Sequence, residues 1–246
     1  MSKTTKAVAA QGVLTRRPAV GALPYPTPSL PLRRAMESAL RVAWKRITKG
    51  SSVYRKQLRA ASEVQITTVL VEQLNAMRTD PNTPVPGFTG SLFETVVRGG
   101  EVTNFDGSAL EKRPDMVFRT IGMPTGTNST HCGLFVECKL IDATHPVRLY
   151  GLHGVRRFVA GEYAWTMTCG LMVAYVGSSA TITADLDPLL RKKKKRYGTT
   201  AFPSVRADDV KSDPPVFTST HTRTWWFPDG QPNPGPIELA HLWLPL

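Results

Sequence analysis

The sequence predicts an α/β protein with a mixed central β-sheet, helices on both sides and a basic N-terminal extension. Two short apolar runs, Met116–Phe118 and Leu134–Val136, have the length of buried strands. A longer apolar run, Cys169–Val176, is typical of a central strand buried on both faces. Segments with apolar residues at helical spacing lie before and between these runs. With 246 residues, of which 41% are hydrophobic, the chain is long enough for one large domain.

The N-terminal quarter carries the positive charge. Residues 1–59 contain 13 Lys and Arg residues and one acidic residue, Glu37, which leaves a net charge of +12. Residues 60–246 contain 18 basic and 18 acidic residues and are neutral. Such an arm suits a polyanion, most commonly nucleic acid, whereas a solvated leader that only aids solubility is the alternative.

Within this quarter, residues 1–28 are expected to form a flexible basic leader, and residues 29–59 a basic helical extension. Apolar residues recur at helical spacing from Ser29 to Lys49, with Pro31 near the start and Gly50 at the stop. We expect this helix to pack on the core with its basic face outward, although binding to a membrane surface is an alternative. The candidate phosphate-binding residues on it are Arg33, Arg34, Arg41, Lys45 and Arg46.

A second helix is predicted from Tyr54 or Ser62 to Met77. Ser62 and Gln65 have the spacing of a capping box, which places Glu63 in the first turn. A negative charge there also stabilises the helix dipole, so a purely structural role for Glu63 is the alternative. The elements expected to follow are a loop at Asp80–Gly90 and a strand pair at Ser91–Asp106.

The C-terminal half is predicted to alternate helices and strands. A helix at about Val147–Met167 carries Arg156 and Arg157, which either contact a substrate backbone or form a solvated face. A short helix, Thr183–Tyr197, ends in six consecutive cations that are either a solvated helix end or a phosphate-contacting patch. The remaining predicted elements are a loop at Ala201–Pro215 and closing strands at Val216–Phe227 and Ile237–Leu244.

Three charged residues stand on the two short strands. Asp115 precedes the first strand, and Glu137 and Lys139 flank Cys138 at the end of the second. Strand alternation puts Glu137 and Lys139 on one face, and pairing of the strands would bring Asp115 to them. Two carboxylates in a small volume require a cation, and their oxygens suit Mg²⁺ or Mn²⁺. A surface hairpin with a solvated Asp and a Glu/Lys pair is the alternative.

These residues resemble a known family. Pro114-Asp115, followed by Glu137-Cys138-Lys139 on an apolar strand, is similar to the motif of the PD-(D/E)XK nuclease superfamily. The resemblance covers about residues 60–177 and implies a restriction-endonuclease-like core and Mg²⁺- or Mn²⁺-dependent hydrolysis of phosphodiester bonds. It also implies that Asp115, Glu137 and the Cys138 carbonyl hold the metal and that Lys139 positions the attacking water. Family members often bring one more acid from a preceding helix, which matches Glu63, with Glu72 as the weaker alternative.

The resemblance leads to the expected function. Residues 60–246 would form the nuclease domain, an endo- or exonuclease for which DNA is the favoured substrate and RNA remains an alternative. A role in restriction or anti-phage defence follows only by analogy. A homodimer or a defence-complex partner remains open. The alternatives are a nucleic-acid-binding or complex subunit that does not cleave, and a hydrolase of another phosphate ester.

Other classes of protein are disfavoured by the sequence. No apolar run has the length of a membrane span, and the N-terminus lacks the apolar segment of a signal peptide. The three cysteines have no metal-ligand spacing and are expected to be buried, reduced thiols, and the five histidines form no zinc motif. A cytoplasmic protein without a membrane partner is therefore expected.

Overall fold

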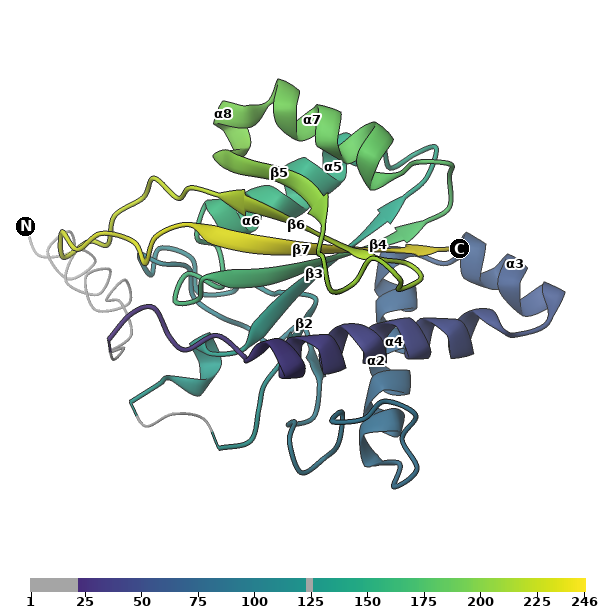
Figure 1. Ribbon diagram of the computed structural model, residues 1–246. Coiled ribbons are helices and arrows are strands. Elements are labelled where there is room, and N and C mark those ends of the chain that lie inside the picture. The colour runs from purple at the N-terminus through teal and green to yellow at the C-terminus, as the bar shows by residue number, and fades with distance from the viewer. Residues whose placement is uncertain (1–21, 123–125) are drawn as a thin grey trace, which may run out of the picture.

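A seven-stranded mixed β-sheet forms the centre of the computed structural model, which describes residues 22–122 and 126–246. The strand order is β1-β2-β3-β4-β7-β6-β5. β3, β4 and β7 are parallel neighbours, and the strands on either side of them pair antiparallel. The prediction of an α/β protein with a mixed sheet is confirmed (Figure 1). Most of the leader predicted over residues 1–28 lies outside the described residues.

The strands differ in length and burial. The two-residue strand β1 and the three-residue strand β2 form one end of the sheet, and every residue of the eight-residue β4 is buried. The strands are β1 Val97–Arg98, β2 Met116–Phe118, β3 Leu134–Ile141, β4 Cys169–Val176, β5 Thr199–Val205, β6 Val216–His221 and β7 Ile237–Pro245.

Helices cover both faces of the sheet (Figure 1). α2 and α4 pack on one face, together with alternate residues of the strands such as Val136, Cys138 and Val173. α5 to α8 lie over the other face, where Phe135, Met172 and Ala174 point. The helices are α2 Leu30–Thr48, α3 Ser52–Ala60, α4 Glu63–Thr79, α5 Val147–Tyr150, α6 Arg156–Val159, α7 Asp187–Lys192 and α8 Lys194–Tyr197. Three further turns are a 3₁₀ turn, η1 Ser129–His131, and two π-helical turns, η2 Gly151–Val155 and η3 Ile182–Leu186.

Several sequence predictions are confirmed. The strands at 116–118 and 134–136 pair antiparallel, with Met116 opposite Val136. The capping box at Ser62 and Gln65 is present, and α4 begins at Glu63. All three cysteines are free and buried. Within residues 22–122 and 126–246, no helix is long and apolar enough to cross a membrane.

Four predicted elements are wrong in extent, and one of them is the strand predicted at Val216–Phe227, which ends at His221. The strand pair expected at Ser91–Asp106 is reduced to β1 and isolated bridges, because most of the segment has irregular backbone without strand pairing. The helix expected to reach Met167 ends at Val159, since Gly161 adopts φ +68° and starts a turn. Most of the strand β5 lies within the loop expected at Ala201–Pro215. β5 is an edge strand, and it accommodates Pro203 because a residue in an edge strand need not donate a backbone hydrogen bond.

A buried chain of hydrogen bonds joins the strands β6 and β7 to the helices above them. The Tyr150 hydroxyl contacts His241 Nδ1 at 2.8 Å, and His241 Nε2 contacts Ser219 Oγ at 2.7 Å. Ser219 Oγ also contacts His221 Nε2 at 2.7 Å, and His221 Nδ1 lies 2.8 Å from the Tyr197 carbonyl. Because a carbonyl only accepts, His221 Nδ1 donates to Tyr197. With both histidines neutral, each of the other groups in the chain then also donates toward Tyr197.

These buried histidines make stability sensitive to acid. Burial lowers the pKa of His221 to about 4, of His241 to about 3 and of His131 to about 4. In the unfolded chain a histidine has a pKa near 6.5. As the pH falls below this value, the unfolded chain binds protons that the folded protein does not bind, so the free energy of unfolding decreases. Burial raises the pKa of Glu137 to about 7 and also raises the pKa of Asp115, and both shifts act in the opposite direction. These two carboxyl groups are outnumbered by the three histidines.

We therefore expect the unfolding free energy to fall between pH 6.5 and about pH 4, each unopposed histidine contributing ~1.4 kcal/mol per pH unit. Chemical denaturation at a series of pH values measures this slope. A stability that stays level or increases over this interval would contradict the assignment of neutral, buried histidines.

Candidate active site

One ammonium group, that of Lys139, lies among three carboxylates. Its Nζ is 2.9 Å from Glu63 Oε1, 2.8 Å from Glu137 Oε1 and 3.8 Å from Asp115 Oδ2. Nζ also donates to the Cys138 carbonyl at 2.6 Å. The structure thus brings together all four charged residues that the sequence singles out for the site.

Three separate elements supply the carboxylates. Antiparallel pairing of β2 with β3 places Asp115 beside Glu137, and Asp115 Oδ2 accepts from the Cys138 backbone N–H at 2.7 Å. The capping box starts α4 at Glu63, whose Oε2 accepts from the Leu140 backbone N–H at 2.9 Å. Both acids are therefore fixed against the backbone of β3. The weaker candidate Glu72 is exposed, away from this cluster.

Glu137 is the most enclosed member of the cluster, because its side chain has no solvent exposure. Besides Lys139, its Oε1 accepts from Arg157 Nη1 at 2.7 Å. Its Oε2 accepts a short hydrogen bond from the buried hydroxyl of Tyr163. Three donors therefore fix both oxygens of this carboxylate.

Tyr163 is a site residue that the sequence analysis did not predict. It follows the turn at Gly161, in a segment predicted to be helical, so its direction could not be derived from periodicity. Arg157 was expected to contact nucleic acid, and the structure directs it to Glu137. In the sequence, the one feature that could point to Arg157 or Tyr163 is that both follow the strand that carries Glu137 and Lys139.

The electrostatics of the cluster favour a charged Lys139. Burial alone would lower the pKa of Lys139, but Glu137, Asp115 and Glu63 together raise it above its usual value. Burial raises the pKa of Asp115 despite the opposing charge of Lys139. Lys139 is therefore an ammonium at neutral pH, suited to stabilising negative charge and not to accepting a proton.

The carboxylate and carbonyl oxygens of the cluster determine whether it could hold the metal ion that the resemblance implies. Within residues 22–122 and 126–246, no group of three or more His, Cys, Asp and Glu side chains is arranged to hold a metal ion. The oxygens of Asp115, Glu137 and the Cys138 carbonyl nevertheless surround a single cation, Lys139 Nζ, at 2.6 to 3.8 Å. Mg²⁺ needs only one or two protein carboxylates, because waters complete its shell. The set fits a divalent cation if the ammonium moves aside.

A polar cavity of about 370 Å³ opens beside Arg157 and Tyr163. Its cations are held by acids, with Lys112 Nζ 3.0 Å from Glu162 and Arg113 paired with Glu101. The lining residues are Glu111, Lys112, Arg113, Arg157, Glu162 and Tyr163. Arg157 and Tyr163, two of the three residues that donate to Glu137, thus have a polar cavity next to them.

The arginines expected to bind nucleic acid from the N-terminal helix are largely engaged within the protein. Arg33 pairs with Glu238 at 3.0 Å, and Arg34 with Asp208 at 2.5 Å. Arg41 is buried against Asp209 and donates to the Pro214 carbonyl at 2.8 Å. Lys45 and Arg46 are exposed on the same helix. The helix that carries them, α2, packs into the core beside the sheet.

Protein-family models, curated proteins and solved structures were each compared with this chain, and none gives a significant match.

Proposed function

We propose that this protein is a metal-dependent nuclease that hydrolyses phosphodiester bonds in nucleic acid. The observation that carries the proposal is the convergence of Glu63, Asp115 and Glu137 on Lys139. These carboxylates come from a helix start and from two adjacent strands, which is the arrangement implied by resemblance to the PD-(D/E)XK superfamily. A restriction-endonuclease-like core with a basic N-terminal extension is part of the same proposal.

Each residue has a chemical role in this proposal. Asp115, Glu137 and the Cys138 carbonyl would hold Mg²⁺ or Mn²⁺, with Glu63 completing the shell. A bound metal ion of this kind lowers the pKa of water and neutralises charge on a phosphate. The ammonium of Lys139 orients the attacking water and stabilises the charge that develops on the phosphate.

Arg157 and Tyr163 act as positioning residues for Glu137. Two donors outside the metal set fix its carboxylate, so the ligand geometry is established before a substrate arrives. DNA is the proposed substrate, and restriction or anti-phage defence in the cytoplasm is the proposed setting, by analogy with the family.

A second candidate is a nucleic-acid-binding subunit that does not cleave. The saturation of Glu137 favours it, because Lys139, Arg157 and Tyr163 occupy the oxygens that a metal ion would need. In that case the cluster would be a structural ion-pair network, and the protein would bind nucleic acid without requiring a divalent cation.

A cleavage assay separates the two functions. Single- and double-stranded DNA and RNA are incubated with the protein in Mg²⁺, Mn²⁺ or EDTA. We expect cleavage of DNA with either metal and none in EDTA, and we expect Asp115→Asn to lower the rate by ~10²–10³. The matched control is Asp106→Asn, which changes a carboxylate hydrogen-bonded to Ser108 in a turn and should cleave at the parent rate. Nucleic acid bound but intact under every condition would favour the binding subunit.

A further inference from the structure

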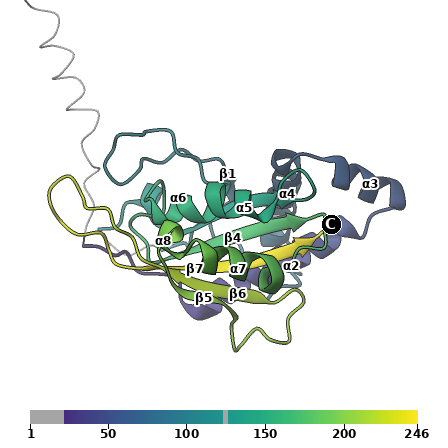
Figure 2. The same ribbon diagram turned by 90° about the horizontal axis from the view of Figure 1, so that it is seen from above.

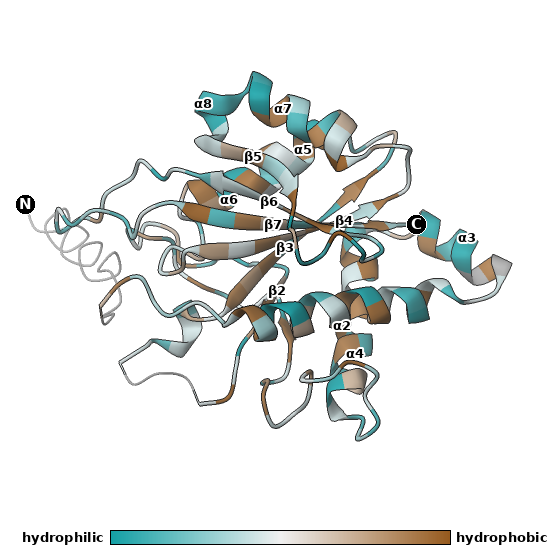
Figure 3. Ribbon diagram, in the orientation of Figure 1, coloured by the Kyte–Doolittle hydropathy of each residue, from teal (hydrophilic) through white to brown (hydrophobic). Residues whose placement is uncertain are grey.

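Five of the six consecutive cations of the sequence form an exposed surface above the sheet, and the sixth, Arg191, pairs with Asp187 at 2.7 Å. We define the basic ridge as Lys192, Lys193, Lys194, Lys195 and Arg196, together with Arg156 of α6. All of these side chains are exposed, and among the described residues no carboxylate forms an ion pair with them. The sequence contains no acidic residue between Asp187 and Asp208. Figure 3 shows the hydrophilic character of α8 at the outer edge of the fold.

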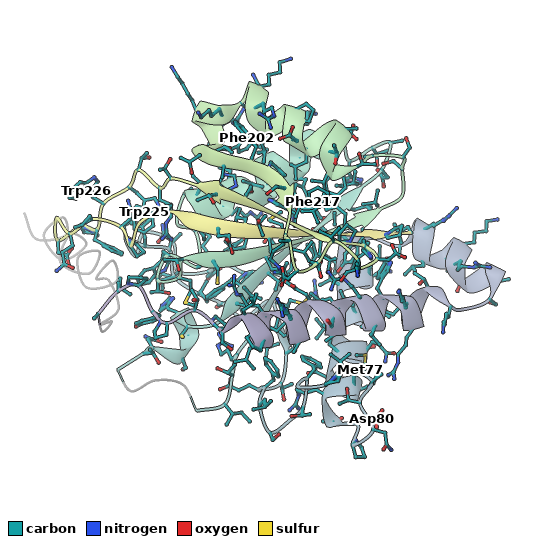
Figure 4. The ribbon with its side chains drawn as sticks, viewed as in Figure 1. Met77, Asp80, Phe202, Phe217, Trp225 and Trp226 are labelled. Atoms are coloured by element: carbon teal, nitrogen blue, oxygen red, sulfur yellow. The ribbon has the colours of Figure 1, made fainter. Side chains whose placement is uncertain are left out.

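Packing holds the ridge in place on the protein. Tyr197, at the end of α8, is buried against Gly151 so closely that a Cβ at Gly151 would lie 2.6 Å from the Tyr197 hydroxyl. The Arg191 guanidinium stacks over the Phe202 ring at 4.1 Å, and Lys194 Nζ lies 5.9 Å from it. Figure 4 shows Phe202 beneath α7 and α8. The cations therefore project from a fixed surface, which reduces the entropy lost when a ligand binds.

The ridge is continuous with the candidate active site. α6 and α8 are in contact, and Figure 2 shows the two helices next to each other. Burial raises the pKa of Tyr197, and the nearby charges of Arg196 and Arg156 oppose this shift, so both arginines lie close to one side chain. The next residue, Arg157, contacts Glu137 at 2.7 Å. Positive charge thus extends from the carboxylate cluster across α6 to α8.

The chemistry of the ridge fits a phosphate backbone better than a lipid surface. A helix that binds a membrane surface combines cations with exposed apolar side chains. Among the described residues, the exposed large hydrophobic side chains all lie outside residues 187–206; they are Leu30, Val53, Val64, Leu92, Val97, Leu110, Ile121, Val210 and Trp226. Unpaired cations without exposed apolar neighbours are typical of contacts to sugar–phosphate backbones.

We propose that the basic ridge binds the sugar–phosphate backbone of duplex DNA at phosphates flanking the bond held at Lys139. The inference rests on the proposed nuclease function, for which it names the surface that holds the substrate. It also assigns substrate binding to the face of the sheet that carries α6 and α8. The cations of α2, which the sequence analysis predicts to bind phosphate, lie on the opposite face (Figure 1).

The test compares two variants with equal numbers of neutralised cations. The ridge variant changes Lys192, Lys193, Lys194 and Lys195 to Gln, and the matched control changes the exposed Lys45, Arg46, Arg55 and Lys56 to Gln. Both are made in the Asp115→Asn background so that binding is measured without cleavage. Fluorescence anisotropy with labelled duplex DNA gives affinity across a salt series, and anionic vesicles serve as the lipid arm.

We expect the ridge variant to lose ~10–100-fold in DNA affinity and about 2 to 4 units of log–log salt slope, because each phosphate contact contributes ~0.9. The control should keep the parent slope. The proposal is overturned by a ridge variant that binds like the parent, by an equal loss in the control, or by a loss of vesicle binding alone. If the quadruple variant does not fold, Lys193→Gln with Lys195→Gln is measured instead, with an expected loss of about 1 to 2 units of slope.

This readout is independent of catalysis. If the ridge variant binds DNA more weakly but the parent protein never cleaves DNA, the proposed role of the ridge is supported and the proposed nuclease function is rejected. Cleavage by the parent with unchanged binding by the ridge variant would reject the ridge and leave the nuclease proposal standing.

Discussion

Lys139→Met is expected to lower single-turnover cleavage by ~10²–10³ without weakening Mg²⁺ binding. The variant removes the ammonium that contacts Glu63 and Glu137 at 2.9 and 2.8 Å, while leaving an unbranched side chain of similar length. Glu63, Asp115 and Glu137 then lose the Lys139 ammonium, although Arg157 still pairs with Glu137. The increased repulsion among the carboxylates favours any divalent ion that enters. Rapid-quench kinetics measures the rate, and titration calorimetry measures Mg²⁺ affinity.

Lys112→Met is the matched control for this substitution. Lys112 is also a partly buried lysine in an ion pair, with Glu162 at 3.0 Å, but it lies outside the carboxylate cluster. We expect it to cleave at close to the parent rate. Parent-like cleavage by Lys139→Met, or a loss of Mg²⁺ affinity as large as that of Asp115→Asn, would contradict the role of Lys139 as a charge stabiliser.

Ser219→Ala is expected to lower the free energy of unfolding by roughly 2–5 kcal/mol. Ser219 Oγ accepts from His241 Nε2 and donates to His221 Nε2, both at 2.7 Å. Alanine leaves one buried donor and one buried acceptor without partners, and no water reaches side chains that have no exposure. Urea denaturation at pH 7 measures the loss.

The matched control for stability is Ser204→Ala, an exposed serine on the neighbouring strand β5. This change should shift the unfolding free energy by less than about 0.5 kcal/mol. A Ser219→Ala protein as stable as the control would mean that the histidine chain is not a determinant of stability.

Local sequence patterns predicted the parts of the site that depend on local geometry. Alternation along β3 places Glu137 and Lys139 on one face, and the contact of 2.8 Å between them agrees with this. The Ser62–Gln65 capping box identified where α4 begins, and therefore that Glu63 lies at its first turn. The two patterns span only three and four residues, so no long-range information was needed.

Contacts between distant segments could not be predicted in this way. The arginines of α2 appear free in the sequence, yet Arg33 and Arg41 pair with acids more than 160 residues away. Those pairings depend on how the C-terminal half packs against α2. The contact of Tyr163 with Glu137 likewise depends on the turn at Gly161. The strand β5 could not be predicted because Pro203 and the irregular alternation of apolar residues do not match a strand pattern.

Asp115 and Lys139 are expected to act as parts of one catalytic unit, and a double-substitution cycle distinguishes this from two independent contributions. Single-turnover cleavage is measured for the parent, Asp115→Asn, Lys139→Met and the protein with both changes. Residues that act as one unit lose activity non-additively, so the double variant should cleave no more than about threefold more slowly than the slower single variant. Rates at the parent level in both single variants, or losses that multiply in the double variant, would contradict the claim.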